Sequence, residues 1–466
     1  MASQPELLAP AGSLEMMRTA FAYGADAVYA GQPRYSLRVR NNSFSRLATL
    51  ASGIEEAHAA NKLFYLVANI YPHNTKLRSF EADLAPVIEL QPDALIMADP
   101  GLIMMVRERW PDVPVHLSVQ ANTTNYAAVR FWQSVGIKRI ILSRELSLEE
   151  IEEIRQTCPE MELEVFVHGA LCIAYSGRCL LSGYFNHRDP NQGSCTNSCR
   201  WDYRLHAGEE DGSGDVHADG SSALGNSRSS ATVGTATRSR LEVLDNLNRG
   251  EGPRQHGQSK LWLLEESTRP GELMPIEEDE HGTYILNSRD LRAIEHVHRL
   301  VEIGVDSLKI EGRTKSPYYV ARTAQSYRRA IEHARSGQAF DPALLDELDG
   351  LANRGYTDGF YQRQSSNAQQ NYLRGHSESA RSLLVGEMTT ADQTEALIEV
   401  EVKNAFAVGD EVEFIQPHAN VRCKIGTILN ADGEAIGRVP GSGRRVRLPL
   451  PDGLDPLQPC FIARLV

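Results

Sequence analysis

Short apolar runs alternate with longer amphipathic segments through the first 170 residues of the chain. The apolar runs have the length of buried strands, and the segments between them have the period of helices. In LSLEEIEEIRQTC (146–158), Ser147 is a candidate N-cap, acidic residues fill the first turn and an apolar stripe follows. Apolar strands separated by helices predict a parallel sheet. The predicted strands lie at 5–10, 25–31, 62–70, 94–100, 113–119, 138–143 and 163–169.

An eighth strand is predicted at 306–312, after a long interruption of the pattern. Eight strands with intervening helices favour a TIM-like (β/α)8 barrel over an open Rossmann sheet. The chain contains neither GxGxxG nor GxxxxGK[ST], which removes the two commonest nucleotide-binding motifs. The predicted fold class is therefore α/β, a (β/α)8 barrel with a long insertion after the seventh strand.

The rest of the chain divides by composition. The segment 206–258 is rich in Gly, Ser, Ala and Asp, which cannot bury a core, so we expect it to be disordered. After 383 the sequence alternates in the manner of strands, with Gly and Asp turns, and predicts a small β-barrel domain. The predicted parts are 1–205, barrel strands one to seven with a cysteine cluster; 206–258, the insertion; 259–360, its end, strand eight and further helices; 361–382, a linker; and 383–466, the β-domain.

The net charge of −13 argues at first against a nucleic-acid partner. Residues 206–283, however, hold 15 acidic and 7 basic side chains, a net of −8, so the remainder is close to neutral. Within residues 422–447, six cations are accompanied by only two acidic residues, Asp432 and Glu434, which fits either an RNA-binding surface or a solvated face. These cations are Arg422, Lys424, Arg438, Arg444, Arg445 and Arg447.

The N-terminus lacks the pattern of a signal peptide, and no run of about 18 uncharged apolar residues is present. We therefore expect a cytoplasmic protein with no membrane partner. Thiols stay reduced in that compartment, so disulfides are not expected, and an odd total of seven cysteines fits a disulfide framework poorly.

Four of the seven cysteines lie within residues 168–200, in the pattern C-x6-C-x15-C-x3-C. Zinc sites usually pair cysteines two to four residues apart, and only the last pair fits that spacing. Four thiolates suit either zinc or an iron–sulfur cluster, and the wide first spacing favours the cluster without deciding the matter. The alternative without a metal is four buried free thiols that pack as small hydrophobic residues, and the surrounding turn residues disfavour it. The four are Cys172, Cys179, Cys195 and Cys199.

Polar residues recur where the predicted strands end, at the rim where barrel enzymes keep their active sites. Each of these residues taken alone could have a purely structural role, as a helix cap, a member of an ion pair or a core histidine. Together they suggest a site for a polyanion or a dicarboxylate, because arginine binds such groups bidentately. The candidate catalytic residues are His168, Glu145, Glu311 and Lys309. The candidate substrate-binding residues are Arg34, Arg38, Arg40, Asn69, Gln120, Asn122, Arg144, Arg178 and Arg313.

The segment EVFVHGALCIAYSGRCLLS resembles the signature of the peptidase U-32, or collagenase-like peptidase, family. ELLAPAGSLEMMRTAFAYGADAVYAGQPRYSLRVRNNSF, HLSVQANTTN, RDPNQGSCTNSCRW and SLKIEGRTKS resemble its branch of prephenate-dependent tRNA uridine hydroxylases. The resemblance covers the barrel and continues into the C-terminal domain, but not the insertion at 206–258.

The resemblance implies oxygen-independent conversion of the wobble uridine of tRNA to 5-hydroxyuridine, with prephenate as co-substrate. It also implies a [4Fe–4S] cluster on the four clustered cysteines. We expect the two carboxylates of prephenate to pair with rim arginines such as Arg34, Arg38, Arg144 or Arg313. Two alternatives remain, a collagenase-like peptidase and a non-catalytic RNA-binding protein. The absence of HExxH and GxSxG disfavours the first.

Overall fold

The structure is a computed structural model of the 466-residue chain. It describes residues 4–31, 34–36, 43–170, 203–210, 216–218, 261–266, 273–279, 282–285, 290–313, 315–351, 353, 355–362, 382–392 and 396–465. The chain divides into two compact units, residues 1–196, 288–370 and 377–466 in the first and 197–287 and 371–376 in the second.

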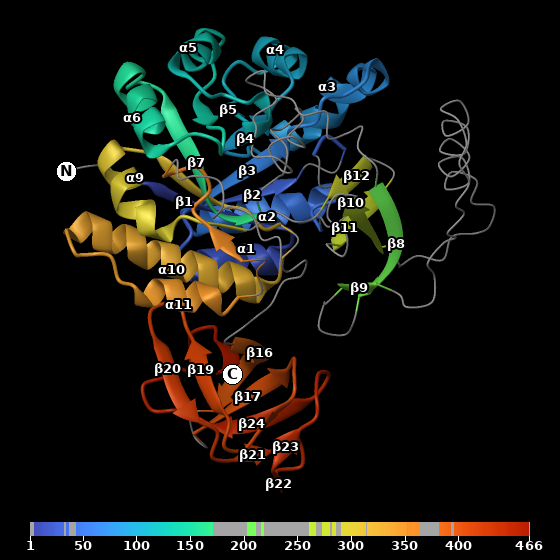
Figure 1. Ribbon diagram of the computed structural model, residues 1–466. Helices are drawn as coiled ribbons and strands as arrows, with labels where there is room; N and C mark the ends of the chain where they lie inside the picture. The colour runs from blue at the N-terminus through green and yellow to red at the C-terminus, as the bar shows by residue number, and fades with distance from the viewer. Residues whose placement is uncertain are drawn as a thin grey trace, which may run out of the picture. The chain divides into compact units, whose positions relative to one another are not determined.

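Eight parallel strands of the first unit form a closed barrel, as the hydrophobic pattern predicted (Figure 1). Each strand pairs with the next in the sequence, and β7 pairs with β14, which itself pairs with β1 and so closes the ring. The strands are β1 (Glu6–Pro10), β2 (Ala27–Gly31), β3 (Leu63–Ala68), β4 (Ala94–Met97), β5 (Val115–Leu117), β6 (Arg139–Ile141), β7 (Glu162–Ala170) and β14 (Ser307–Ile310).

Helices cover the outside of the barrel (Figure 1). Some of these helices begin at side-chain caps: the side chain of the predicted N-cap Ser147 accepts the backbone N–H of Glu150, and Asp99 accepts the backbone N–H of Leu102 at the start of α4. They are α1 (Leu14–Ala22), α2 (Leu47–Ala59), α3 (Asn74–Ile88), α4 (Pro100–Arg109), α5 (Tyr126–Ser134), α6 (Leu148–Thr157), α9 (Val297–Ile303), α10 (Pro317–Ser336) and α11 (Ala343–Asp349).

Strand β7 has a second partner where the barrel is interrupted. Strand β13 (Asp290–Arg292) pairs with the end of β7 in the antiparallel direction, with Asp290 opposite Ala170, and also pairs with β15 (Tyr356–Thr357). The long insertion therefore leaves the barrel and returns to it at two directly paired residues.

The C-terminal part is the expected small β-domain, built as one antiparallel sheet in the order β20-β19-β25-β16-β17-β24-β21-β22 together with a separate pair. Its core contains Val400, Phe414 and Ile462. The strands are β16 (Ser382–Asp392), β17 (Leu397–Val402), β19 (Glu411–Ile415), β20 (Asn420–Lys424), β21 (Ile428–Leu429), β22 (Ala435–Ile436), β24 (Arg445–Pro449) and β25 (Phe461–Leu465), with β18 (Phe406–Ala407) and β23 (Arg438–Val439) as the pair.

The C-terminal domain packs against α1 and α10 of the barrel. The hydroxyl of Tyr23 donates hydrogen bonds to the carbonyls of Ile415 and Pro459, at 2.8 and 3.1 Å. Arg322 of α10 forms a buried ion pair with Glu413. The barrel and the C-terminal domain thus share a buried polar and apolar contact.

The second unit is described by an antiparallel sheet in the order β12-β11-β10-β8-β9. The strands are β8 (Tyr203–Glu210), β9 (Val216–Ala218), β10 (Leu261–Glu266), β11 (Leu273–Asp279) and β12 (Gly282–Ile285). The boundary that composition placed after 205 falls inside β8, and regular structure returns at Leu261, close to the expected 259. Most of 206–258 and of the predicted linker lie outside the described residues.

Across the described ranges, no helix combines the length and the apolar character needed to cross a membrane.

Candidate active site

The mouth of the barrel, at the carboxyl ends of its strands, contains two aromatic rings and a buried ammonium group. The Nζ of Lys309 lies 4.5 Å from the ring centroid of Tyr29 and 5.4 Å from that of Phe166, within the range of cation–π attraction. The hydroxyl of Tyr29 donates to the carbonyl of Ile310 at 3.0 Å and to Oε2 of Glu311 at 2.9 Å. Two predicted catalytic residues, Lys309 and Glu311, therefore lie around one tyrosine.

Below the mouth, the barrel interior holds charges instead of the branched apolar side chains that usually fill it. Glu164, which is fully buried, accepts a 2.7 Å bond from Lys309 and lies 3.5 Å from Arg139. Arg139 also contacts Glu6 at 2.7 Å and Glu162 at 3.0 Å. Burial lowers the pKa of Lys309, and the negative charge of Glu164 opposes that shift.

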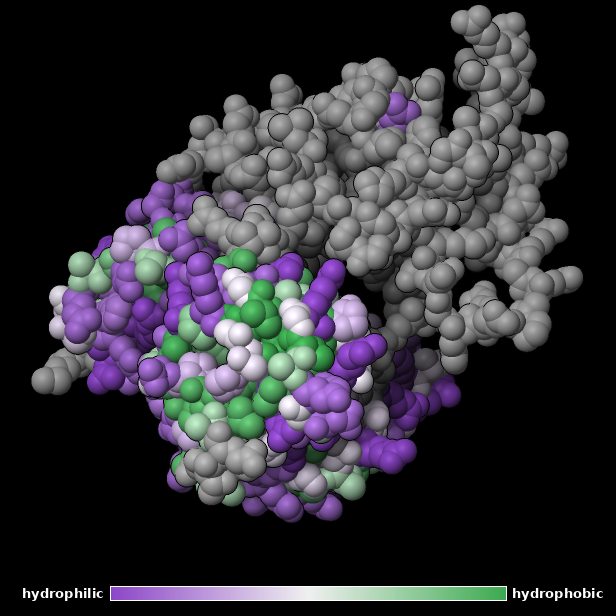
Figure 2. Space-filling view, turned by 90° about the horizontal axis from the view of Figure 1, so that it is seen from below, coloured by the Kyte–Doolittle hydropathy of each residue, from purple (hydrophilic) through white to green (hydrophobic). Residues whose placement is uncertain are grey.

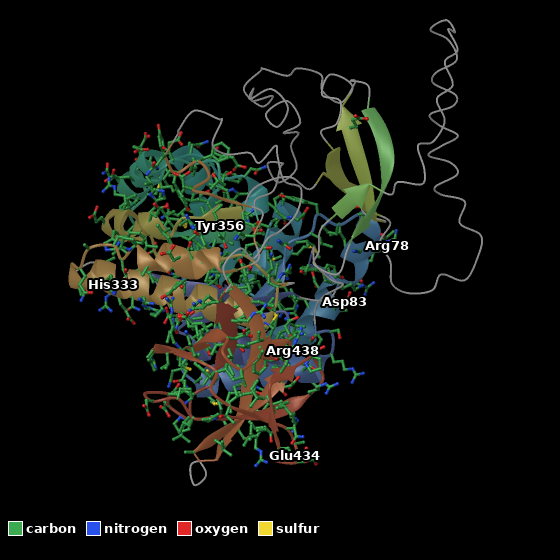
Figure 3. All side chains as sticks on the ribbon, turned by 60° about the horizontal axis from the view of Figure 1, so that its bottom comes forward. Arg78, Asp83, His333, Tyr356, Glu434 and Arg438 are labelled. Carbon is green, nitrogen blue, oxygen red and sulfur yellow. The ribbon has the colours of Figure 1, made fainter. Side chains whose placement is uncertain are left out.

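The three rim arginines that the structure describes have different surroundings. The guanidinium of Arg144 lies 3.8 Å from the ring centroid of Phe166, and Arg313 donates to Ser36 at 3.0 Å beside Tyr29. Arg34 instead forms a 2.7 Å ion pair with Asp83 of α3, which is labelled in Figure 3. Arg144 and Arg313 therefore approach the aromatic rings of the mouth. Arg38, Arg40 and Arg178 lie outside the described residues.

Amide and hydroxyl groups gather after β3 and β5. Asn69 donates to Ser118 at 3.2 Å, and the carbonyl of Gln120 accepts the hydroxyl of Tyr71 at 3.0 Å. Asn122 adopts a left-handed conformation, with φ of 52°, which asparagine tolerates better than most residues. These backbone turns place the predicted amide residues at the carboxyl end of the barrel.

Glu145 follows β6, the neighbouring strand. Its carboxylate accepts a hydrogen bond from the hydroxyl of Ser143, whose own backbone N–H donates to Thr123 at 3.1 Å. These contacts connect the ends of β5 and β6, so Glu145 lies on the same rim as the amide residues.

His168 is buried against tyrosines. Strand alternation would put it on the same face as Glu164 and Phe166, but the β7–β14 register shifts next to it. Its ring centroid lies 5.8 Å from Tyr319 and 5.6 Å from Tyr327, both of α10, and 5.5 Å from Tyr356, which Figure 3 labels. Burial lowers its pKa to about 3, aided by the charges of Arg292 and Lys315, so the imidazole is neutral.

The end of β7 is held by several hydrogen bonds. Tyr361 donates to the carbonyl of Phe166 and Tyr327 to that of Val167, both at 2.6 Å. Gly169 has φ of +104°, and a Cβ at this position would lie 2.5 Å from the carbonyl oxygen of Glu311. Only glycine fits this approach, which fixes the strand three residues before Cys172.

The four predicted cluster ligands, Cys172, Cys179, Cys195 and Cys199, lie outside the described residues. Among the residues that are described, no group of three or more His, Cys, Asp or Glu side chains is arranged to hold a metal ion. The assignment of the cluster therefore stays a prediction from the sequence.

Four of the six cations predicted in the C-terminal domain lie beside or opposite glutamates on neighbouring strands. Arg422 contacts Glu413 at 3.1 Å, and Arg445 contacts Glu399 at 3.2 Å. Register places Lys424 opposite Glu411 and Arg447 opposite Glu399. Hydrophobic residues also interrupt the hydrophilic ones on the face turned to the viewer in Figure 2. These pairings favour a solvated face for four of the six cations.

Sequence reasoning missed Glu164, Arg139, Tyr29 and Phe166 as parts of this site. The available signal was a charged residue inside an otherwise apolar strand, as in LEVFV (163–167) and SLKI (307–310). A lone charge in a buried strand requires a partner within the barrel.

The closed (β/α)8 barrel with polar groups at the carboxyl ends of its strands is the architecture of a barrel enzyme. The sequence profile of peptidase family U32 matches residues 12–371, and that of the U32 C-terminal domain matches residues 380–464. The chain belongs to peptidase family U32.

Similar proteins cover nearly the whole chain. A protein of Escherichia coli (strain K12) named tRNA hydroxylation protein P is 56% identical over 97% of this chain and 95% of its own length. The protein of the same name from Haemophilus influenzae is 53% identical over 97% of this chain and 94% of its own. A more distant relative named collagenase, from Porphyromonas gingivalis, is 23% identical over 97% of this chain and 96% of its own.

Proposed function

We propose that this chain is a tRNA hydroxylase that converts the wobble uridine to 5-hydroxyuridine without dioxygen, using prephenate as co-substrate. The observation that carries the proposal is the 56% identity to a tRNA hydroxylation protein P over nearly the full length of both chains. Both family regions, barrel and C-terminal domain, are included in that match.

The geometry of the mouth supports a reaction on an anionic ligand. Lys309, Arg144 and Arg313 all lie against the rings of Tyr29 and Phe166. Prephenate carries two carboxylates, and arginine binds such groups bidentately. Arg144 and Arg313 lie against the rings of the mouth, whereas the Arg34 guanidinium forms an ion pair with Asp83 on α3.

The proposal includes a [4Fe–4S] cluster on Cys172, Cys179, Cys195 and Cys199. The donor set fits, since four thiolates are the usual ligands of such a cluster. The segment starts just after Ala170, at the end of β7 that is fixed by Gly169 and its neighbours. When bound, the cluster would supply redox chemistry or Lewis acidity. Anaerobic purification with iron and sulfide quantitation should give four irons per chain, lost when the cysteines become serine; stoichiometric zinc would contradict this part.

The reaction is tested in a host that has this chain as its only U32 hydroxylase, with and without the ability to make prephenate. Nucleosides from digested tRNA would be quantified by mass spectrometry. We expect 5-hydroxyuridine and its derivatives only in cells that make prephenate. Equal amounts in both hosts would remove prephenate from the proposal, and tRNA binding without any product would favour the RNA-binding alternative.

A peptidase is the second candidate, on the strength of the 23% identity to a collagenase. A cysteine nucleophile needs a nearby base. His168, the histidine nearest in sequence to Cys172, is packed among three tyrosines. Gelatin cleavage by homogeneous protein, abolished by Cys172→Ala, would support the peptidase.

A further inference from the structure

We propose that the buried Lys309–Glu164 pair acts in the reaction, with Glu164 positioning the ammonium of Lys309 to bind an anionic oxygen at the mouth. This inference rests on the proposed function and deepens it. Its first support is the position of the pair: Lys309 of β14 is two residues before Glu311, which follows the strand, and Tyr29 contacts both side chains.

The second support is unused hydrogen-bonding capacity. An ammonium group has three N–H donors. Within the described part of the chain, Lys309 donates one hydrogen bond, to Glu164 at 2.7 Å, and its other contacts are the two ring faces. Lys309 is only 3% exposed, so water does not readily satisfy the other two donors. A buried cation with two free donors at a barrel mouth is the arrangement that an anionic oxygen would complete.

The third support is energetic. Removing two charges from water costs about as much as their attraction returns, and apolar residues of similar volume are often as stable or more stable in their place. Most barrels accordingly fill this region with valine, isoleucine and leucine. Stability therefore does not account for an ion pair here, and a role in the chemistry does.

Arg139 prevents the charges below the pair from transferring protons to the mouth. A guanidinium does not give up its proton, so the series from Glu162 through Arg139 to Glu164 cannot relay protons to the mouth. What Arg139 provides is positive charge beside Glu164, which holds that carboxylate in place to orient Lys309. Glu164 is thus a positioning residue, and Lys309 the group that contacts substrate.

The test replaces the pair without leaving a lone buried charge, in the double variant Lys309→Met/Glu164→Leu. We expect its thermal midpoint to stay within a few degrees of wild type, with hydroxylation in the tRNA nucleoside assay falling at least about 100-fold, the size of a lost catalytic group. The matched control is Arg322→Met/Glu413→Leu, which removes an equally buried pair at the contact with the C-terminal domain and should leave hydroxylation unchanged. A folded Lys309/Glu164 double variant with activity within about threefold of wild type would overturn the inference.

The kinetics of a milder variant, Glu164→Gln, distinguish two possible sources of the anionic oxygen, prephenate and the uracil ring. A higher KM for prephenate points to a carboxylate of the co-substrate, and a lower kcat points to charge developing on the uracil ring. If the double variant does not fold, the pH profile of Glu164→Gln decides the matter. Losing that charge lowers the pKa of Lys309, so the alkaline limit of activity should move to lower pH; an unchanged limit would overturn the inference.

Other charged or titratable groups face Lys309 from the elements packed around it, and all of them are kept in that variant. They are Glu311 just after β14, Arg139 on β6, His116 on β5 and Tyr29 on β2. Wild-type chain must first yield hydroxylated tRNA in the same assay. If it does not, the proposed function fails, whereas an active double variant refutes only the role of the pair.

Discussion

Ala170 and Asp290 face each other directly in the antiparallel pairing of β7 and β13, although residues 171–289 lie between them along the chain. The pairing continues through Gly169 with Leu291 and His168 with Arg292. The insertion therefore begins and ends at one point of the barrel rim. This arrangement allows a long segment to be added without interrupting the ring of strands.

A first prediction is that the barrel folds without the whole inserted segment, residues 171–289. Replacing 171–289 by a two-residue Asn-Gly turn joins strands that are already in hairpin register. We expect a cooperative thermal transition and native-like circular dichroism, with hydroxylation lost because the four cysteines are gone. An aggregated or molten product would show that the barrel needs the inserted segment.

Gly169→Ala tests how the strand leading to the cysteines is fixed. The added Cβ meets the Glu311 carbonyl oxygen at 2.5 Å in a backbone conformation with φ of +104°. We expect the free energy of unfolding to fall by about 2 kcal/mol or more, and hydroxylation to fall with it. The control is Gly304→Ala, which has φ of +84° but no atom within 4 Å, and should cost only about 1 kcal/mol. Equal losses in the two variants would contradict the close approach.

The neutral His168 predicts a pH dependence of stability. Its pKa in the folded chain is about 3, below the ordinary 6.5 of an unfolded histidine. As the pH falls below 6.5, the unfolded state binds a proton that the folded state does not, so stability is lost. The slope is about 1.4 kcal/mol per pH unit. His168→Phe should reduce the slope of unfolding free energy by that amount between pH 6 and 5. His116, whose pKa burial also lowers, is present in both proteins and cancels; identical slopes would contradict the assignment.

The C-terminal surface gives a prediction about salt. Arg438, labelled in Figure 3, and Arg444 are exposed, and the register gives neither a facing glutamate. If this surface contacts tRNA phosphates, Arg438→Ala/Arg444→Ala should lower the slope of log affinity against log salt by about two. The control Arg422→Ala/Arg445→Ala removes arginines bound to Glu413 and Glu399 and should change the slope less. A wild-type slope in both variants would place the tRNA elsewhere.

The barrel was predictable because each strand carries its own apolar signal and several helices begin at a side-chain cap. The eight strands and the N-cap at Ser147 depend on local sequence. The position of rim residues followed from the rule that strand ends meet at one face.

The partners of those rim residues could not be predicted, because they come from distant parts of the chain. Nothing near Lys309 in sequence indicates Glu164, and nothing near Arg34 indicates Asp83. The surroundings of His168 depend on a register shift between β7 and β14, which strand alternation does not reveal. The cationic tail likewise looked unbalanced until pairing placed Glu399 and Glu411 opposite its arginine and lysine.

The central claim, that this chain hydroxylates tRNA, is tested most directly by the nucleosides of a strain from which its gene is removed, in a host without a second route. Tandem mass spectrometry of digested tRNA would measure 5-hydroxyuridine and its derivatives at the wobble position. We expect them to disappear on deletion, to return with the wild-type gene, and to stay absent when Cys172, Cys179, Cys195 and Cys199 are replaced by serine. Normal levels in the deletion strain would contradict the account.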